Sequence, residues 1–259
     1  MFGQKRRCRR FQSIFTFAWL ITMIVRMPPS PYDETFFGGH HRGSRRSAAV
    51  IVPLVLEHFP ARSVVDVGCG TGAWLAEFAR NGITEYLGVD GDHVPRNMLM
   101  ISVERFYACN LASFSPDGRC FDLACSLEVA EHLPADRAPH FVAALTDLAP
   151  AVLFSAAIPG QRGTGHVNEQ WPSYWASLFA ARGYVGVDCV RPRVFNDERV
   201  EPWYRQNVIA YCKKVPLGLT AMNLPYDYDR VDPEMWRHRC LETKAREKSL
   251  PRLVRSLFR

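Results

Sequence analysis

Two carboxylates and an imidazole lie close together in the sequence, at Glu128, Glu131 and His132. If these residues form a helical turn, the spacing i, i+3 and i+4 places the three side chains on one face. Carboxylate oxygens together with imidazole nitrogen suit a divalent ion such as Mg²⁺, Mn²⁺ or Fe²⁺. We therefore expect a metal site here. Two alternatives stay open, namely that His132 acts alone as a general base or that the charges form an ordinary loop surface.

A glycine-rich polar loop covers residues 159–171. It is too hydrophilic for a core, and it contains Asn168, Glu169 and His166, the last of which can complete a metal coordination sphere. Loops commonly carry the residues that bind substrate, so we expect this one to contact the acceptor of a reaction. The alternative is a solvated connection without a function. Residues 203–206, just before the last predicted strand, are also expected to line the pocket.

Alternating glycines mark a second candidate site, the segment DVGCGTG at residues 66–72. Glycine permits a tight turn and close approach of a ligand to the backbone, and a helix that begins there offers free amide donors. Asp90 follows about 20 residues later, where a carboxylate can bind the two hydroxyls of a ribose. A nucleoside ligand is therefore expected. The Gly-x-Gly-x-Gly spacing departs from the Gly-x-Gly-x-x-Gly fingerprint of dinucleotide enzymes.

The candidate residues of both sites lie between short apolar strands and amphipathic helices that alternate along the chain. The predicted strands are residues 63–68, 85–90, 105–111, 120–127, 151–158, 184–190 and 207–214. The predicted helices are residues 44–59, 73–82, 135–150, 173–183 and 237–259, and residues 28–43 are expected to be irregular. This alternation predicts a parallel sheet with helices on both faces. The carboxyl ends of its strands then bring the candidate residues to one edge.

The glycine turn and the order of the elements resemble one known family. The sequence VVDVGCGTGAWLAEF is similar to motif I of the class I S-adenosylmethionine (SAM)-dependent methyltransferases, and the resemblance extends over residues 44–214. It implies an α/β, Rossmann-like fold whose seven-stranded, mostly parallel sheet has an antiparallel edge strand and helices on both faces. It also implies that the chain is a methyltransferase and that SAM is its cofactor.

The resemblance assigns cofactor contacts to individual residues. Those residues are Asp66, Gly68, Gly70, Gly72, Asp90 and Asn110. By this resemblance the three glycines line the methionine part of SAM, Asp66 supports the turn, and Asp90 binds the ribose hydroxyls. Asn110 stands where the family usually has an adenine-binding Asp, and an Asn side chain still accepts or donates a hydrogen bond.

The Glu-x-x-Glu-His pattern at residues 128–132 is similar to the metal motif of two methyltransferase groups. These are the small-RNA 3′-terminal 2′-O-methyltransferases and the ubiquinone-pathway O-methyltransferases, in which the ion orients the acceptor hydroxyl and lowers its pKa. The candidate metal ligands, with the loop histidine added, are Glu128, Glu131, His132 and His166. The candidate catalytic residues are His132, His166 and Glu131.

The 259-residue chain carries a formal net charge of +6, which at face value suggests an acidic partner. Residues 1–26 contain six basic residues and no acid, and residues 237–259 contain eight basic residues and two acids. The middle of the chain, residues 27–236, therefore has a net charge of −6. Because the basic charge lies at the two ends, we do not expect the middle to bind nucleic acid.

Residues 1–26 consist of a basic stretch and the apolar run FQSIFTFAWLITMIV, an arrangement similar to a signal peptide. The run is shorter than the roughly 20 apolar residues of a spanning helix, and no small-x-small cleavage site follows it. We expect Met27 to be the natural start, or residues 1–26 to be a weak interfacial anchor and the only membrane contact. The eight cysteines include no Cys-x-x-Cys pair, which favours free thiols in a reducing compartment.

We expect an N-terminal extension at residues 1–43, a methyltransferase domain at 44–214 and a basic C-terminal extension at 215–259. The expected activity is transfer of a methyl group from SAM to a small-molecule acceptor in the cytoplasm, at a hydroxyl of a sugar or secondary metabolite. A divalent metal such as Mg²⁺ is a possible second cofactor. Two alternatives stay open, an RNA 2′-O-methyltransferase and a non-enzymatic SAM-binding protein.

Overall fold

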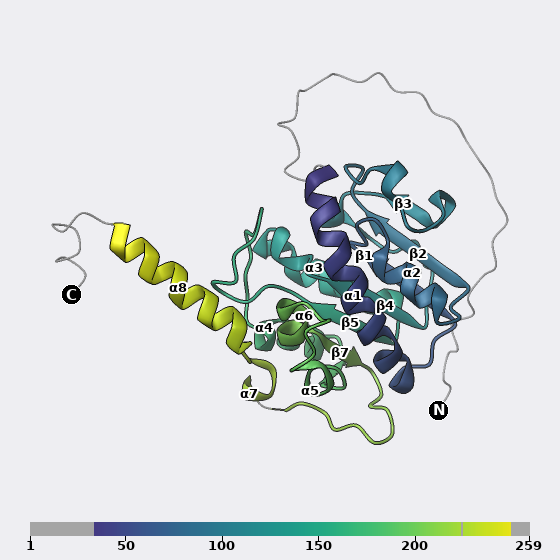
Figure 1. The fold of residues 1–259 in the computed structure, drawn as a ribbon. Helices are drawn as coiled ribbons and strands as arrows, with labels where there is room; N and C mark the ends of the chain where they lie inside the picture. Colours follow the sequence, from purple (N-terminus) through teal and green to yellow (C-terminus); the bar gives the residue numbers. More distant parts are fainter. Residues whose placement is uncertain (1–33, 224, 250–259) are drawn as a thin grey trace.

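A single sheet organises the molecule, and the computed structural model describes residues 34–223 and 225–249 of it (Figure 1). Within those residues seven strands pair in the order β3-β2-β1-β4-β5-β7-β6. They are β1 (Ser63–Val67), β2 (Glu85–Asp90), β3 (Phe106–Ala108), β4 (Leu123–Leu127), β5 (Ala151–Ser155), β6 (Val185–Val187) and β7 (Ile209–Cys212). Strand β7 is antiparallel to β5 and β6, and the remaining pairs are parallel. The predicted Rossmann-like sheet is confirmed, with its antiparallel strand one place in from the edge.

Helices cover both faces of the sheet, as predicted. They are α1 (Glu34–His58), α2 (Ala73–Arg80), α3 (Ala138–Leu148), α4 (Pro172–Ala181), α5 (Arg191–Val194), α6 (Pro202–Asn207), α7 (Pro225–Tyr228) and α8 (Pro233–Ser249). Successive residues of a strand point to opposite faces of the sheet. Val64 therefore belongs to the core that contains residues of α1, α2, α5 and α6, and Val65 belongs to the core that contains residues of α3, α4 and α7. Two apolar cores therefore hold the carboxyl ends of the central strands in place.

Helix α1 begins at Glu34, so the prediction that residues 28–43 are irregular is wrong from residue 34 onward. The glycines of this segment weaken a helix without forbidding it. Gly43 lies against Glu201, since a Cβ there would lie 2.5 Å from Glu201 Oε1, although a shift of that flexible side chain would relieve the overlap. Tertiary contact thus outweighs local preference in this helix.

Strand β3 is shorter than predicted and ends at Ala108. The reason is local: the Asn110 side chain accepts a hydrogen bond from the Ala112 amide at 3.0 Å and begins the 3₁₀ turn Leu111–Ser113. Asparagine forms such turns readily because its short side chain bonds nearby amides. The polar end of the predicted strand therefore leaves the sheet.

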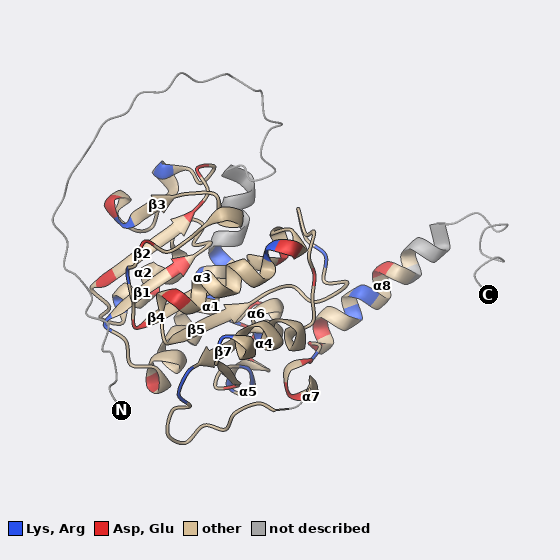
Figure 2. Ribbon diagram, turned by 180° about the vertical axis from the view of Figure 1, so that it is seen from behind, with Lys and Arg blue, Asp and Glu red and all other residues tan. Residues whose placement is uncertain are grey.

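The segment after β7 packs on the domain before α8 extends away from it (Figure 1). Ala221 forms a bridge with Val187, and Met222, Tyr228 and Asp232 are buried. Basic and acidic residues are both spread along α8, so the helix does not present a purely basic surface (Figure 2). None of the helices formed by the described residues combines the length and apolar character needed to cross a membrane. Residues 1–26 lie outside the described residues, and the predictions about them stay predictions.

Candidate active site

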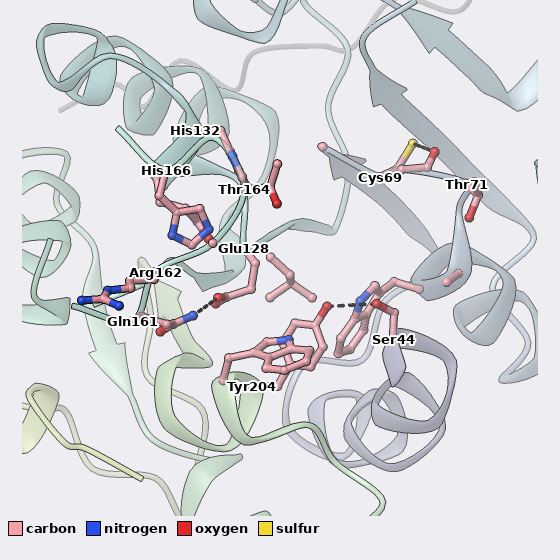
Figure 3. Close-up of a pocket in the computed structure, with 18 of the residues that line it drawn as sticks. Ser44, Cys69, Thr71, Glu128, His132, Gln161, Arg162, Thr164, His166 and Tyr204 are labelled. Carbon is pink, nitrogen blue, oxygen red and sulfur yellow. Dashed lines mark hydrogen bonds between the residues drawn. The ribbon is translucent and has the colours of Figure 1, made fainter. Parts of the chain in front are cut away.

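A cavity of about 480 Å³ lies at the carboxyl ends of β1 and β4 (Figure 3). The glycine turn after β1 forms one wall, and the segment after β4 and the loop after β5 form the facing wall. Ser44 of α1, Trp203 and Tyr204 of α6 and Met235 of α8 close the remaining sides. The topology thus brings the two candidate sites of the sequence to a single cavity.

The three glycines of the turn all have positive φ angles, 88° at Gly68, 53° at Gly70 and 84° at Gly72. A Cβ at Gly68 would lie 2.3 Å from Val129 Cγ2, and one at Gly72 would lie 2.9 Å from Ile101 Cγ1. A Cβ at Gly70 would meet nothing within 4 Å. Two glycines therefore permit close packing, whereas Gly70 leaves room for a ligand at the cavity wall.

Asp90, at the end of β2, is bound to this turn. Its Oδ2 accepts the Gly70 amide at 2.7 Å, and its Oδ1 accepts the Gly91 amide at 2.6 Å. Burial raises the pKa of Asp90, and the two amide hydrogen bonds oppose that shift. The carboxylate thus positions the backbone of the turn and lies beside it.

Asp66, on β1, is buried, and its Oδ2 has no hydrogen-bond partner among the described residues. Burial, with the charge of Asp90 as a second cause, raises the pKa of Asp66 to about 8. Asn110 is exposed at the start of its 3₁₀ turn. Gly68 and Gly70 line the cavity, whereas Gly72, Asp66, Asp90 and Asn110 are not among its lining residues.

On the facing wall, the structure brings three predicted metal ligands together. Ligand atoms of Glu131, His132 and His166 all lie within 4.8 Å of one another. The two imidazole rings meet edge to face, with their centroids 4.9 Å apart. The loop is attached to this cluster through the Val167 and Asn168 amides, which donate to the Glu131 carbonyl at 2.9 and 3.0 Å.

The electrostatics of this cluster suit a cation. Glu131 is completely buried, and neither carboxylate oxygen has a well-formed hydrogen bond among the described residues, although the backbone amides of Glu131 and Ala157 partly offset its burial. Burial, followed by the charge of Glu128, raises the pKa of Glu131 well above its usual value. Burial and the neighbouring His166 lower the pKa of His132 to about 4, so this imidazole is neutral at pH 7. Neutral imidazole and an uncompensated buried carboxylate are groups that a divalent ion would satisfy.

Glu128 has a different environment from the one its spacing suggests. The expected helical turn over residues 128–132 is wrong, because Glu128 has a φ of 55° and the 3₁₀ turn η4 runs from Ala130 to His132. Its carboxylate accepts Gln161 Nε2 at 2.8 Å (Figure 3), and it also accepts Asn207 Nδ2 at 3.1 Å. Burial raises the pKa of Glu128 to about 7. Glu128 therefore lines the cavity beside the cluster of Glu131, His132 and His166 and is not one of its members.

Gln161 lies in the polar loop that the sequence predicted to contact the acceptor, whereas Asn207 is a site residue that no motif indicated. Asn207 Nδ2 also donates to Gln161 Oε1 at 2.9 Å, and Gln206 Nε2 donates to Asn207 Oδ1 at 2.9 Å. The side-chain amides of Gln161, Gln206 and Asn207 therefore form a hydrogen-bonded network. Within it, one N–H group of Gln161 and one of Asn207 donate to the Glu128 carboxylate. For Asn207 the one available signal was its position beside residues 203–206, since no sequence spacing links residues 46 positions apart.

The sequence matches a family model described as a methyltransferase domain over residues 39–184, which is more than half of the chain. The chain therefore belongs to this methyltransferase domain family. No protein with a curated description matches the sequence.

Solved structures of methyltransferases have a similar fold. The sugar N-methyltransferase KedS8 from Streptoalloteichus sp ATCC 53650 superposes with a TM-score of 0.55 at 17% identity, covering 77% of this chain and 99% of that one. CalS10, an amino pentose methyltransferase from Micromonospora echinaspora, gives 0.51 at 18% identity, with 73% and 100% covered. At sequence identities of 17% and 18%, the structural similarity is evidence of a common fold alone.

Proposed function

We propose that the chain binds SAM at the glycine turn and transfers its methyl group to a small-molecule acceptor. We place the acceptor atom at a hydroxyl of a sugar or secondary metabolite, and the reaction in the cytoplasm, where SAM is made. One observation carries the proposal: a single cavity joins the glycine turn to the cluster of Glu131, His132 and His166. Methyl transfer depends mainly on alignment of donor and acceptor, and a shared cavity of this kind supplies that alignment.

The cofactor half of the proposal rests on the turn at residues 68–72. Gly70 leaves space at the cavity wall, and the following helix α2 begins at Ala73 with its amide groups directed at the turn. In the proposed complex Gly68 and Gly70 contact the methionine part of SAM, and Asp90 binds the ribose hydroxyls. Membership of the methyltransferase domain family supports SAM as the cofactor.

On the cavity wall that faces the glycine turn, Glu131, His132 and His166 would hold a divalent ion. Such an ion, when bound, supplies a Lewis acid that lowers the pKa of an acceptor hydroxyl. Three features of the chain support this assignment: the buried carboxylate of Glu131, which lacks a well-formed hydrogen bond, the neutral imidazole of His132 and the short separation of all three side chains. Glu128 lies next to these groups and adds negative charge that favours a cation.

The rest of the cavity suits an acceptor with both apolar and hydroxylated faces. Trp203 and Tyr204 provide aromatic surface, and Gln161 and Glu128 provide polar atoms. Pockets that recognise small polar molecules combine these two kinds of wall. The sugar substrate of KedS8 and the amino pentose substrate of CalS10, on the same fold, support a sugar-like acceptor here.

The direct test is product formation. Purified protein is incubated with SAM and pools of hydroxylated small molecules, and S-adenosylhomocysteine is measured with Mn²⁺ or with a chelator. We expect acceptor-dependent product that the chelator abolishes. SAM binding without product from any acceptor pool would favour the non-enzymatic alternative. Methylation of RNA whose binding survives removal of both basic ends and falls steeply with salt would favour an RNA methyltransferase.

A further inference from the structure

The loop between β5 and α4 is organised around one carboxylate, that of Glu169. Its Oε2 accepts the Gly160 amide at 2.7 Å, and its Oε1 accepts the Arg162 amide at 2.6 Å. His166 Nδ1 lies 2.9 Å from the same Oε1. The Glu169 side chain is only 19% exposed and its contact with His166 is partly buried, whereas the Gly160 and Arg162 amides that it binds lie at the surface.

The backbone at two of these partners is in an unusual conformation. Arg162 has a φ of 60°, which is rare for a residue with a side chain, and Gly160 has a φ of 83°. Such conformations persist when the surrounding structure holds them. Here the amide of each residue is bound by the Glu169 carboxylate, which therefore stabilises the loop in this shape.

The same contacts determine which nitrogen of His166 carries hydrogen. An ionised carboxylate accepts hydrogen bonds and donates none, so Nδ1 must be the donor in its contact with Glu169. In the neutral ring, Nε2 then holds the lone pair. The ring also depends on Gly163, because a Cβ at that position would lie 2.2 Å from His166 Nε2.

We propose that Glu169 is a positioning residue that selects the Nδ1–H form of His166 and so presents Nε2 as the ligand nitrogen of the cluster with Glu131 and His132. The part that concerns the ion rests on the proposed function. A carboxylate that accepts the second N–H of a ligand histidine fixes the ring and raises its basicity as a ligand.

The first test is Mn²⁺ binding to the full chain, measured by calorimetry, with the Glu169→Gln variant. Glutamine offers one acceptor oxygen, which would bind at most two of the three N–H groups, and its neutral amide is a weaker acceptor for the His166 N–H than the carboxylate is. Loss of such a contact behind a ligand histidine weakens metal binding by about 10–100-fold, and we expect a loss in this range. A variant with Mn²⁺ affinity equal to that of the wild type would overturn the inference.

Glu242→Gln is the matched control. Glu242 is also a carboxylate beside this loop, and it contacts the Arg162 guanidinium at 3.4 Å. Its ion pairs among the described residues are with Arg162, His238 and Arg239, and none is with His166. We expect Mn²⁺ affinity and SAM affinity to be unchanged in this variant, and an equal loss of Mn²⁺ affinity in both variants would contradict a specific role for Glu169.

The second test needs no metal and reads the ring of His166 in the wild type, with one variant used only to assign its signal. Ring ¹⁵N–¹H correlations of histidine-labelled wild type, assigned with His166→Asn, report which nitrogen of His166 is protonated. We expect the Nδ1–H form. The Nε2–H form would overturn the inference. If the wild type binds no Mn²⁺ but shows the Nδ1–H form, the metal part of the proposed function fails and the positioning of His166 by Glu169 stands.

Discussion

At the scale of single residues, the cavity is surrounded by ionisable groups whose protonation differs from that of the free side chains. Burial raises the pKa of Asp66 and Glu131, and burial together with His166 lowers that of His132. All three shifts favour the neutral form. A cationic ligand reverses this preference for the carboxylates, so binding of a cation and folding stability are linked at this site.

Asp66 gives a pH-dependent prediction. Its pKa is 3.8 in the reference state and about 8 in the folded protein, so the folded state holds this proton more tightly. The stability that the protonated carboxyl contributes is complete below pH 4 and is lost as the pH rises toward 8. We expect the melting temperature of the wild type, relative to Asp66→Asn, to fall between pH 5 and pH 8. Thermal unfolding followed by circular dichroism measures this, and a pH-independent difference would disagree with the assignment.

Glu131 tests the metal assignment. Because its raised pKa favours the protonated form without an ion, Glu131→Gln is close to neutral for the apo protein. We expect a melting temperature at pH 7 within a few degrees of the wild type, together with loss of Mn²⁺ binding by calorimetry. Glu242→Gln is again the control. Unchanged Mn²⁺ affinity, or turnover that resists a chelator in both proteins, would remove the metal from the mechanism.

At the scale of elements, the glycine turn separates packing from ligand binding. Gly68→Ala places a Cβ 2.3 Å from Val129 Cγ2, whereas the same change at Gly70 meets open space. Overpacking costs about 1–3 kcal/mol, and the left-handed backbone costs about 1 kcal/mol more for alanine. We expect Gly68→Ala to lower the free energy of unfolding by about 2–4 kcal/mol and Gly70→Ala by about 1 kcal/mol. Urea titrations distinguish the two.

For SAM binding, the informative variant is Gly70→Ala, which has the smaller effect on stability. Gly70→Ala adds a methyl group at the wall where we place SAM, so its SAM affinity falls by tenfold or more relative to the wild type, since about 1.4 kcal/mol corresponds to a factor of ten. Calorimetric titration with SAM checks this. Wild-type SAM affinity in Gly70→Ala would place the cofactor elsewhere.

Most elements were predictable because their apolar periodicity is local. Strands β1, β2, β4 and β5 lie within the predicted ranges, and the junction at Gly68 was readable from residue types alone. Contacts between distant segments were not readable. The φ of 55° at Glu128 and its bonds to Gln161 and Asn207 depend on three segments meeting in space. The start of α1 was missed for the same reason, since Gly43 packs against Glu201.

At the scale of the whole molecule, the predicted boundary between a domain ending at 214 and a C-terminal extension can be tested by truncation. Arg191 is 1% exposed and donates to the carbonyls of Asp227 and Tyr228 at 2.7 and 2.6 Å. Arg205 is buried against Asp232. These contacts indicate that the segment after residue 220 contributes to the fold.

We therefore expect removal of residues 221–259 to lower the melting temperature by about 5 °C or more, because a loss of 1 kcal/mol corresponds to about 2–4 °C in a domain of this size. Removal of residues 250–259 alone gives the baseline with which the longer truncation is compared. Differential scanning calorimetry compares the two. Equal melting temperatures would instead support an independent domain that ends at residue 214.

The distribution of charge also belongs to this scale. The net charge of +6 comes from residues 1–26 and 237–259, and the residues between them sum to −6. The described part of α8 mixes both signs (Figure 2). A protein that lacks residues 1–26 and 250–259 is therefore expected to bind RNA no more tightly than an acidic control protein of equal size, as measured by fluorescence anisotropy at 0.15 M salt. Tight, salt-sensitive binding would contradict a small-molecule acceptor.

The central claim is that one cavity holds SAM on the glycine turn and faces its methyl group toward the cluster of Glu131, His132 and His166. A crystal structure of the full chain with SAM and Mn²⁺ tests it most directly. The account predicts the methionine part of SAM in the cavity against Gly68 and Gly70, its ribose extending past the cavity lining to Asp90, and its methyl group on the side of the cluster. A cofactor whose methionine part lies outside this cavity, or whose methyl group faces away from the cluster, would contradict the account.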